Sequence, residues 1–506
     1  MTEKVAATPA PLVLALAQAV QRQRTAFYAP GHKHGAGISA ALVDLLGTQV
    51  FRADLPELPE LDNLFAPTGP IHAAQVLAAQ TFGAEETFFL ANGSTCGIEA
   101  AFLAVCNPGD QVLIPRNAHL SVLSALVLCG ARPIFLTPMH HGQWDLALGV
   151  TAQQIEQALQ SYPAIRAVVV VSPNYQGICA DIAAIATCVH AQDRILIVDE
   201  AHGAHLSFHA QLPRGAIAGG ADLVIQSTHK VLAAMTQASM LHVQGQRIDR
   251  DRLRKALQLT QSTSPNYLLL ASLDAARQQM AQSGQALMAQ TLEIVQEVRS
   301  RLSNLALFPC LTPEQVALLP GNFQLDLTRL TVDVSALNIT GFTADEWLHE
   351  TLGVTAELPT LRQLAFIFSL GNSRADGKRL VQALAKLVQT ATTLPNATFK
   401  DAPNVAWFGK LLAEPPLSPR EAFFAPARAI AIDHAVGQIS AATLCPYPPG
   451  IPVLLPGERI TQSAVTYLQQ VHKAGGVITG SADPTLQTLQ IIDSTRKLNA
   501  ELIPYH

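Results

Sequence analysis

Between residues 87 and 243, short apolar runs alternate with stretches of helical character, and this alternation limits the fold more than any other feature. The runs that we predict as strands are TFFLA (87–91), QVLIP (111–115), RPIFL (132–136), AVVVVS (167–172), ILIVDE (195–200), LVIQS (223–227) and SMLHV (239–243). Continuous apolar strands separated by helices are typical of a parallel sheet with helices on both faces. The pattern predicts an α/β fold with a mainly parallel, seven-stranded sheet.

The composition excludes several classes of protein. Hydrophobic residues make up 49% of the 506 residues and charged residues only 14%, against about a quarter charged in typical soluble proteins. Intrinsic disorder is excluded, because it requires low hydrophobicity and high charge. The net charge of −5 provides no basic face for nucleic acid. The surplus of apolar residues predicts a large core and a buried subunit interface.

We also expect no membrane segment, because the longest apolar runs are far shorter than the roughly 20 residues that span a bilayer. The segment 11–20 resembles the core of a signal peptide. However, Gln18 interrupts it and no small-residue cleavage site follows, which favours an amphipathic helix. The seven cysteines are scattered and form no CxxC pair. This usage favours buried thiols in a reducing cytoplasm over a disulfide framework.

Outside the sheet region, a long helical stretch runs from Tyr267 to about 304, and strands are expected near 327–335 and 364–372. The stretch 390–420 is rich in turn-forming residues and is predicted to be a linker. We predict four parts: an N-terminal arm with the PGHKHG motif at 1–50, a large cofactor-binding domain at 51–304, a small α+β domain at 305–395 and a C-terminal domain at 396–506.

Polar residues follow nearly every predicted strand, in the segments NGST, RNAH, SPNYQG, DEAHGAH and STHK. Any one of these segments alone is best explained as an ordinary turn. Ligands of parallel sheets bind beyond the carboxyl ends of the strands. Five polar segments at five strand ends therefore indicate one site.

Asp199 and Lys230 define the chemistry expected there. Asp199 ends a buried strand, where a carboxylate needs a partner, and Lys230 lies just beyond the next strand. A lysine in an apolar cleft becomes a nucleophile towards carbonyl groups. The pair suits pyridoxal phosphate, in which the lysine forms a Schiff base and the aspartate keeps the pyridine nitrogen protonated. The alternative is an internal Asp–Lys salt bridge.

A phosphate site is expected where ANGSTCG starts a helix near Ser94, since exposed N–H groups and the Ser94 and Thr95 hydroxyls can bind an anion. The same residues also form routine turns and helix caps. Ser227 and His229 can add donors. His119 can lie flat over the cofactor ring, although a lone histidine is more often an ordinary polar residue.

Three histidines, His202, His205 and His209, raise the question of a metal. Their spacing resembles a zinc signature, but no glutamate stands at a helical spacing beside them, and Glu200 precedes the first. We therefore expect no metal. His202 is the better candidate for the edge of the cofactor, and His205 and His209 for structural roles.

Several motifs together closely resemble those of one enzyme family. They are FYAPGHKHG, LDNLFAPTGPIHAAQ, RNAHLS, DEAHGAH, STHKVLAAMTQASMLHV, STSPNYLLLASLDAAR and CPYPPGIPVLLPGE. Over residues 20–460 the chain resembles the Orn/Lys/Arg decarboxylases, which are fold-type I (aspartate aminotransferase-like) pyridoxal-phosphate enzymes.

The resemblance implies a role for each matching residue. By the family pattern Lys230 carries the cofactor, Asp199 contacts its ring nitrogen and His119 stacks on its ring face. The resemblance also implies that Ser94, Thr95, Ser227 and His229 belong to the surroundings of the phosphate and of the aldimine. Ser262 would reach the phosphate of the neighbouring subunit, so a homodimer with shared active sites is implied. Glu458 is a weaker candidate for a substrate contact.

Two departures from the family pattern matter. Members commonly have lysine after the stacking histidine, where this chain has Leu120, and this change could alter substrate preference or rate. We expect no receiver-like domain before PGHKHG. In this respect the chain resembles the short, biosynthetic arginine decarboxylases. The resemblance therefore implies decarboxylation of arginine to agmatine, in polyamine biosynthesis. The alternatives are lysine or ornithine as substrate, an aminotransferase or α-oxoamine synthase, and a non-catalytic homologue that binds the cofactor.

Overall fold

A computed structural model describes residues 9–22, 24–304, 308–396, 412–447, 452–473 and 475–493. Residues 1–8 of the predicted arm, much of the predicted linker (397–411) and residues 448–451 of the C-terminal motif lie outside the described residues. The chain divides into two compact units. Unit 1 consists of Met1–Ala104, Ile197–Leu292 and Ser369–Gly371, and unit 2 of Val105–Leu196, Glu293–Phe368 and Asn372–His506.

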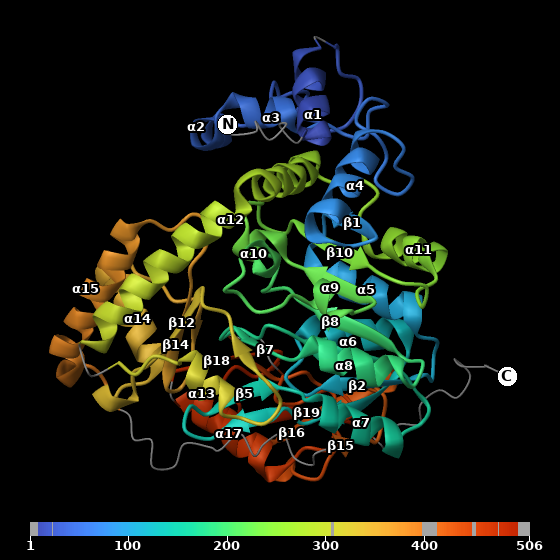
Figure 1. The fold of residues 1–506 in the computed structure, drawn as a ribbon. Helices are drawn as coiled ribbons and strands as arrows, with labels where there is room; N and C mark the ends of the chain where they lie inside the picture. Colours follow the sequence, from blue (N-terminus) through green and yellow to red (C-terminus); the bar gives the residue numbers. More distant parts are fainter. Residues whose placement is uncertain are drawn as a thin grey trace. The chain divides into compact units, whose positions relative to one another are not determined.

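Unit 1 contains three strands and most of a fourth, drawn in blue and green in Figure 1, in the order β1 (Glu86–Leu90), β10 (Ser239–Val243), β9 (Leu223–Gln226) and β8 (Ile195–Asp199, of which Ile197–Asp199 lie in unit 1). The pairs β1–β10 and β10–β9 are antiparallel, and β8–β9 is parallel. Every residue of β8, β9 and β10 is buried. This burial explains why these strands have continuous apolar sequences rather than alternating ones.

The helices that lie wholly or mainly in unit 1 are α1 (Pro11–Gln21), α2 (Ala40–Leu46), α3 (Thr48–Ala53), α4 (Pro70–Phe82), α5 (Gly93–Val105), α9 (Ala216–Gly219), α10 (Thr228–Val231), α11 (Arg250–Thr260) and α12 (Tyr267–Ser303), whose residues from Glu293 onward belong to unit 2. Helix α1 begins with Pro11, whose fixed φ suits the first helical position. It buries Leu12 and Leu16, one helical turn apart. The Leu12 N–H donates to Asp274 of α12 at 2.9 Å, so α1 is held by a buried carboxylate as well as by packing.

Unit 2 contains the remaining strands of the predicted sheet. Its strands β6 (Ile165–Val171), β2 (Gln111–Pro115) and β3 (Arg132–Leu136) are parallel, and the short β15 (Leu412–Ala413) pairs antiparallel with β3. Helices α6 (Leu120–Cys129), α7 (Ala152–Ser161) and α8 (Ile182–His190) connect or flank these strands. Two small pairs complete this part: β4 (Met139–His141) with β5 (Leu146–Gly149), and β7 (Ile178–Cys179) with β11 (Gln324–Leu325).

Two further hydrophobic clusters lie in unit 2. One packs strands β12 (Arg329–Asp333) and β14 (Gln363–Ile367) with α14 (Gly341–Leu352), α15 (Arg374–Thr390) and the end of α12. The short β13 (Leu358–Pro359) pairs with β14. The other lies between residues 432 and 491. The short helix α13 (Pro313–Ala317) precedes β11. The elements of the C-terminal part are α16 (Pro419–Phe424), β16 (Ala427–Ala431), β17 (Cys445–Tyr447), α17 (Gln462–Lys473), β18 (Val477–Thr479) and β19 (Thr488–Ile492).

The predicted α/β fold is confirmed. All seven predicted strands form, as β1, β2, β3, β6, β8, β9 and β10. The predicted number of strands in the sheet is one too low, because the two-residue β15 pairs with β3 as an eighth strand. The strands expected near 327–335 and 364–372 form as β12 and β14, and the helices expected at 11–20 and after Tyr267 form as α1 and α12. Among the described residues, no helix is both long enough and apolar enough to cross a bilayer.

Candidate active site

Lys230 lies immediately after a buried strand. Strand β9 ends at Gln226, Ser227 precedes α10, and this single helical turn contains Lys230. The Lys230 Nζ lies 3.1 Å from Nε2 of His202, whose side chain is buried. The predicted nucleophile and the predicted edge residue are therefore in direct contact within unit 1.

Asp199 is the last residue of β8 and lies opposite Ile225 of β9. It is only 5% exposed, and its Oδ1 accepts a hydrogen bond from the Ala201 N–H at 3.1 Å. Within the described parts of the chain no cation forms an ion pair with it. A buried carboxylate is costly unless it is paired or neutralised. The protonated ring nitrogen of pyridoxal phosphate would provide such a partner.

The predicted anion site lies at the start of α5, and it stays a prediction. Ser94 and Thr95 lie in its first turn, where backbone N–H groups lack helical partners. The Ser227 hydroxyl donates to the Ser94 hydroxyl at 2.8 Å, which joins this turn to the end of β9. Gly97 allows α5 to pack closely against β1, because a methyl group at this position would lie 2.6 Å from Cδ1 of Leu90.

His229 and Ser262 form hydrogen bonds to residues other than Lys230 and Asp199. The His229 Nδ1–H donates to the Ala238 carbonyl at 3.0 Å. Burial, and secondarily the charge of Lys230, lower the pKa of His229, so the ring is held neutral. Ser262 is exposed, and its hydroxyl accepts from the Ser264 N–H at 3.1 Å. Its predicted reach to a neighbouring subunit stays a prediction.

The residues of unit 1 fit pyridoxal phosphate. Lys230 beside His202 is a suitable anchor for an aldehyde, and Asp199 is a buried carboxylate. Ser94 and Ser227 place two hydroxyls at a helix N-terminus. These are the three kinds of group that the cofactor's aldehyde, ring nitrogen and phosphate require.

His119 belongs to unit 2 and precedes α6. Its Nδ1 accepts a hydrogen bond from the Ser121 N–H at 3.1 Å, so the ring caps the helix. This bond fixes the orientation of a half-buried imidazole. Leu120, the departure from the family pattern, is the first residue of α6 and is 39% exposed.

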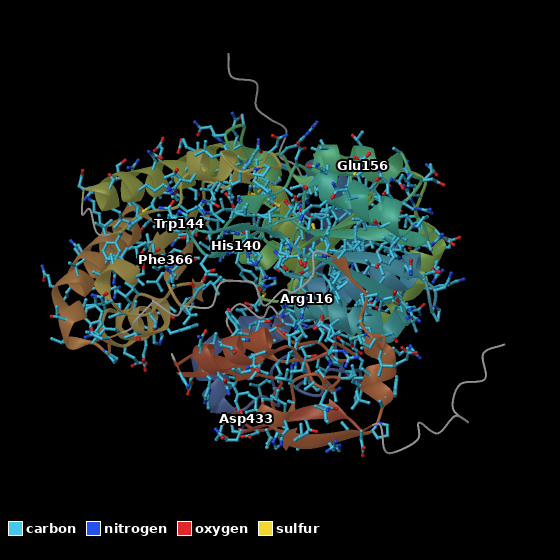
Figure 2. All side chains as sticks on the ribbon, turned by 90° about the horizontal axis from the view of Figure 1, so that it is seen from below. Arg116, His140, Trp144, Glu156, Phe366 and Asp433 are labelled. Atoms are coloured by element: carbon cyan, nitrogen blue, oxygen red, sulfur yellow. The ribbon has the colours of Figure 1, made fainter. Side chains whose placement is uncertain are left out.

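Glu458, the predicted substrate contact, forms a salt bridge in unit 2 with Arg116, whose Nη2 lies 2.7 Å from its Oε2. The same oxygen accepts from the Leu455 N–H at 2.9 Å. Arg116 is 6% exposed and also donates to the carbonyls of Pro452 and Val453. Figure 2 shows Arg116 where the strands of unit 2 meet its C-terminal segment. Sequence reasoning missed Arg116, although it stands in the RNAH motif.

The other two histidines have separate surroundings. His205 is buried, and the His209 Nδ1 accepts from the Gln211 N–H at 3.3 Å. The described residues contain no group of three side chains arranged to hold a metal ion.

Sequence reasoning also missed a row of buried polar side chains in unit 1. Thr87, His242, Gln226 and Glu200 come from β1, β10, β9 and the end of β8, and each is at most 2% exposed. They are joined by Thr87 Oγ1–His242 Nδ1 (2.8 Å), His242 Nε2–Gln226 Oε1 (3.0 Å) and Gln226 Nε2–Glu200 Oε2 (2.7 Å). Isolated polar residues within or just after largely apolar strands were the available signal.

Comparison with known families defines the class of protein. Residues 10–376 match the major domain of the Orn/Lys/Arg decarboxylases, and residues 405–485 match their C-terminal domain. The chain belongs to this family. It is therefore an amino acid decarboxylase, and the predicted class is confirmed over the alternatives of aminotransferase and α-oxoamine synthase.

Individual relatives lie at different distances. An arginine decarboxylase of Bacillus subtilis is 36% identical over 96% of this chain and 99% of its own length. A lysine decarboxylase of Pseudomonas aeruginosa is 25% identical over 92% of this chain and 76% of its own length. The crystal structure of the Francisella novicida lysine decarboxylase has a TM-score of 0.84 with 24% identity, over 96% of this chain and 81% of that one. The structural likeness confirms the fold.

Proposed function

We propose that this protein decarboxylates arginine to agmatine with pyridoxal phosphate as its cofactor. The observation that carries the choice of arginine is the difference between the two kinds of relative. Identity to the arginine decarboxylase is 36% and extends over 99% of that protein, against 25% and 76% for the lysine decarboxylase. Lysine is the second candidate, and the fold shared with a lysine decarboxylase supports it.

Each side chain of the site has one task in this proposal. Lys230 binds the cofactor's aldehyde, and His202 holds the Nζ at the strand end through the 3.1 Å contact. Asp199 keeps a proton on the ring nitrogen, which a buried carboxylate beside that nitrogen favours. When bound, pyridoxal phosphate supplies the electron sink for the electrons left by departing CO₂.

The remaining residues bind and orient. Ser94, Thr95 and Ser227 hold the phosphate with the N-terminus of α5. His229 lies beside Lys230 as a neutral donor to a carbonyl, so it adds no positive charge that would compete there. His119 is the proposed stacking residue, and its helix-capping bond to Ser121 sets the plane of its ring.

The predicted setting of the enzyme belongs to the same proposal. We infer a cytoplasmic homodimer in polyamine biosynthesis, in which Ser262 of one subunit serves the phosphate site of the other. Glu458 stays a weaker candidate for a substrate contact. The division at 1–50, 51–304, 305–395 and 396–506 is the domain arrangement that we propose.

Release of radiolabelled CO₂ tests the proposal. Purified protein with added pyridoxal phosphate is given carboxyl-labelled arginine, lysine and ornithine in parallel, each over a range of concentrations. We expect the highest kcat/KM with arginine. Release from lysine alone would transfer the proposal to lysine, and no release from any of the three would support a non-catalytic homologue.

A further inference from the structure

Glu200 follows Asp199 directly and lies on the opposite face of the sheet. Side chains alternate between the two faces along a strand, and the ladder continues past Asp199, because the Glu200 N–H donates to the Ile225 carbonyl at 2.9 Å. Gln226 and Ser227 alternate in the same way on β9. Asp199 and Ser227 therefore face one side, and Glu200 and Gln226 the other.

The hydrogen bonds of Glu200 have a fixed direction. Its carboxylate accepts the Ala216 N–H at 2.6 Å and the Gln226 amide N–H at 2.7 Å. The Gln226 carbonyl then faces His242, so the His242 ring donates through Nε2 and accepts from the Thr87 hydroxyl through Nδ1. Each of these contacts has one donor and one acceptor, although all the side chains are buried.

The hydrogen bonds of Glu200 link the ends of two neighbouring strands close to Asp199 and Lys230. The Glu200–Gln226 bond crosses from the end of β8 to the end of β9, one residue from Asp199 on one strand and four from Lys230 on the other. The bond to Ala216 also ties the strand end to the first residue of α9. Bonds to a buried carboxylate are strong and directional. They restrict how far the two strand ends can separate.

We propose that Glu200 is a positioning residue, whose carboxylate holds the ends of β8 and β9 at the spacing that lets Asp199 and Lys230 engage the same cofactor. The inference rests on the proposed function in requiring pyridoxal phosphate as the cofactor. It is independent of the amino acid substrate.

The test uses Glu200→Gln, which keeps the size of the side chain. Ala216 and Gln226 both donate to residue 200, and glutamine offers one acceptor and one donor in place of two acceptors. Either one of these hydrogen bonds is lost, or Gln226 and His242 must exchange their donor and acceptor roles. We expect the dissociation constant of pyridoxal phosphate from the folded apoprotein to rise about tenfold, as for loss of a buried hydrogen bond. Absorbance titration of the apoprotein measures it.

The double variant Glu200→Gln with Gln226→Glu is the matched rescue. Its glutamine accepts from Ala216 and donates to the new glutamate, which accepts the His242 N–H, so every bond has a donor and an acceptor again. We expect its cofactor dissociation constant to return to within about threefold of wild type. Thr87→Val is the control, since it removes a buried hydroxyl at the far end of the row. It should lower the melting temperature and leave cofactor affinity unchanged.

A merely structural role for Glu200 predicts a different result. Glu200→Gln would then lower the melting temperature of the apoprotein, as Thr87→Val does, with an unchanged dissociation constant for pyridoxal phosphate. That outcome would overturn the inference. If Glu200→Gln does not fold, Gln226→Met breaks the same link from β9, and unchanged cofactor affinity in that variant would equally overturn it. CO₂ release by the wild type judges the proposed function separately.

Discussion

Lys230 carries the chemistry at the scale of the single residue, because it is the one proposed nucleophile. Replacing it by alanine removes the amine that binds the cofactor's aldehyde. We expect Lys230→Ala to lose CO₂ release by at least about a thousandfold, as when a nucleophile is removed, together with the visible absorption of bound cofactor. Lys255→Ala, on the exposed side of α11, is the control and should keep both. Full CO₂ release by Lys230→Ala would contradict the assignment.

Glu458 is the second residue whose role can be measured. It is an ion-pair partner of the buried Arg116, and Glu458→Gln removes this negative charge from beside the guanidinium. We expect the free energy of unfolding to fall by about 1–3 kcal/mol. Glu414→Gln breaks the exposed pair with Arg132 and should cost less than about 1 kcal/mol.

The kinetics of Glu458→Gln separate two roles. A predicted substrate contact would raise the KM for arginine in addition to lowering stability. An unchanged KM would restrict Glu458 to attaching the C-terminal segment, and unchanged stability would contradict the importance of the Arg116 pair. Urea unfolding and steady-state kinetics of the same preparation distinguish these two roles of Glu458.

The residues of the site were predictable from the sequence where they follow strands. Asp199, Ser227 and Lys230 stand out because polar groups end apolar runs. The Glu200 row was not predictable, because Thr87 and His242 lie 155 residues apart. Single polar residues inside apolar strands do not reveal which partners the strand register gives them. Arg116 was missed for the same reason, since its partners lie more than 330 residues later.

At the scale of elements, the buried row across the four strands of unit 1 predicts an unusual pH dependence. Burial raises the pKa of Glu200 to about 7 and lowers that of His242 to about 3. From pH 4.5 to about 7, folded Glu200 keeps a proton that the unfolded chain has lost, so its contribution to stability falls as the pH rises. From about 3 to 6.5, the unfolded chain protonates His242 and the folded protein does not, so this contribution rises with pH.

The two contributions oppose each other between pH 4.5 and 6.5, and Glu200→Gln removes one of them. The stability advantage of the wild type over this variant should therefore shrink as the pH rises, by up to about 1.4 kcal/mol per pH unit. Urea unfolding at several pH values across this range measures the difference. Parallel pH profiles of the two proteins would show that Glu200 does not titrate in that range.

Which elements form was largely predictable. The seven long apolar strands and the 37-residue α12 have patterns that their own residues determine. The two-residue strands β7, β11, β13 and β15 were not predicted, because so short a run has no period of its own. They exist only where a partner strand supplies the hydrogen bonds.

At the scale of the whole molecule, the apolar surplus of the composition has a visible counterpart in unit 1. Helix α2 has no buried residue, and Leu45 and Leu46 are 76% and 52% exposed. Phe27 is 94% exposed. Apolar side chains gathered in one segment favour a subunit interface, in agreement with the proposed homodimer.

Charges placed in this segment should weaken the dimer. We expect the double variant Leu45→Glu and Leu46→Glu to shift towards monomer in light scattering, with a dimer dissociation constant at least about tenfold higher. Leu318→Glu, at an exposed position in unit 2, is the control and should leave the dimer intact. A monomeric wild type, or a variant that dimerises normally, would contradict the proposed interface.

In the proposed reaction this chain removes CO₂ from arginine and leaves an amine. Product analysis by mass spectrometry, with CO₂ measured in the same reaction, tests it most directly. We predict agmatine and CO₂ in equal amounts, in a reaction that needs pyridoxal phosphate and Lys230 and needs no acyl-CoA or keto-acid acceptor. Arginine recovered unchanged, or converted to a keto acid without CO₂, would contradict the account.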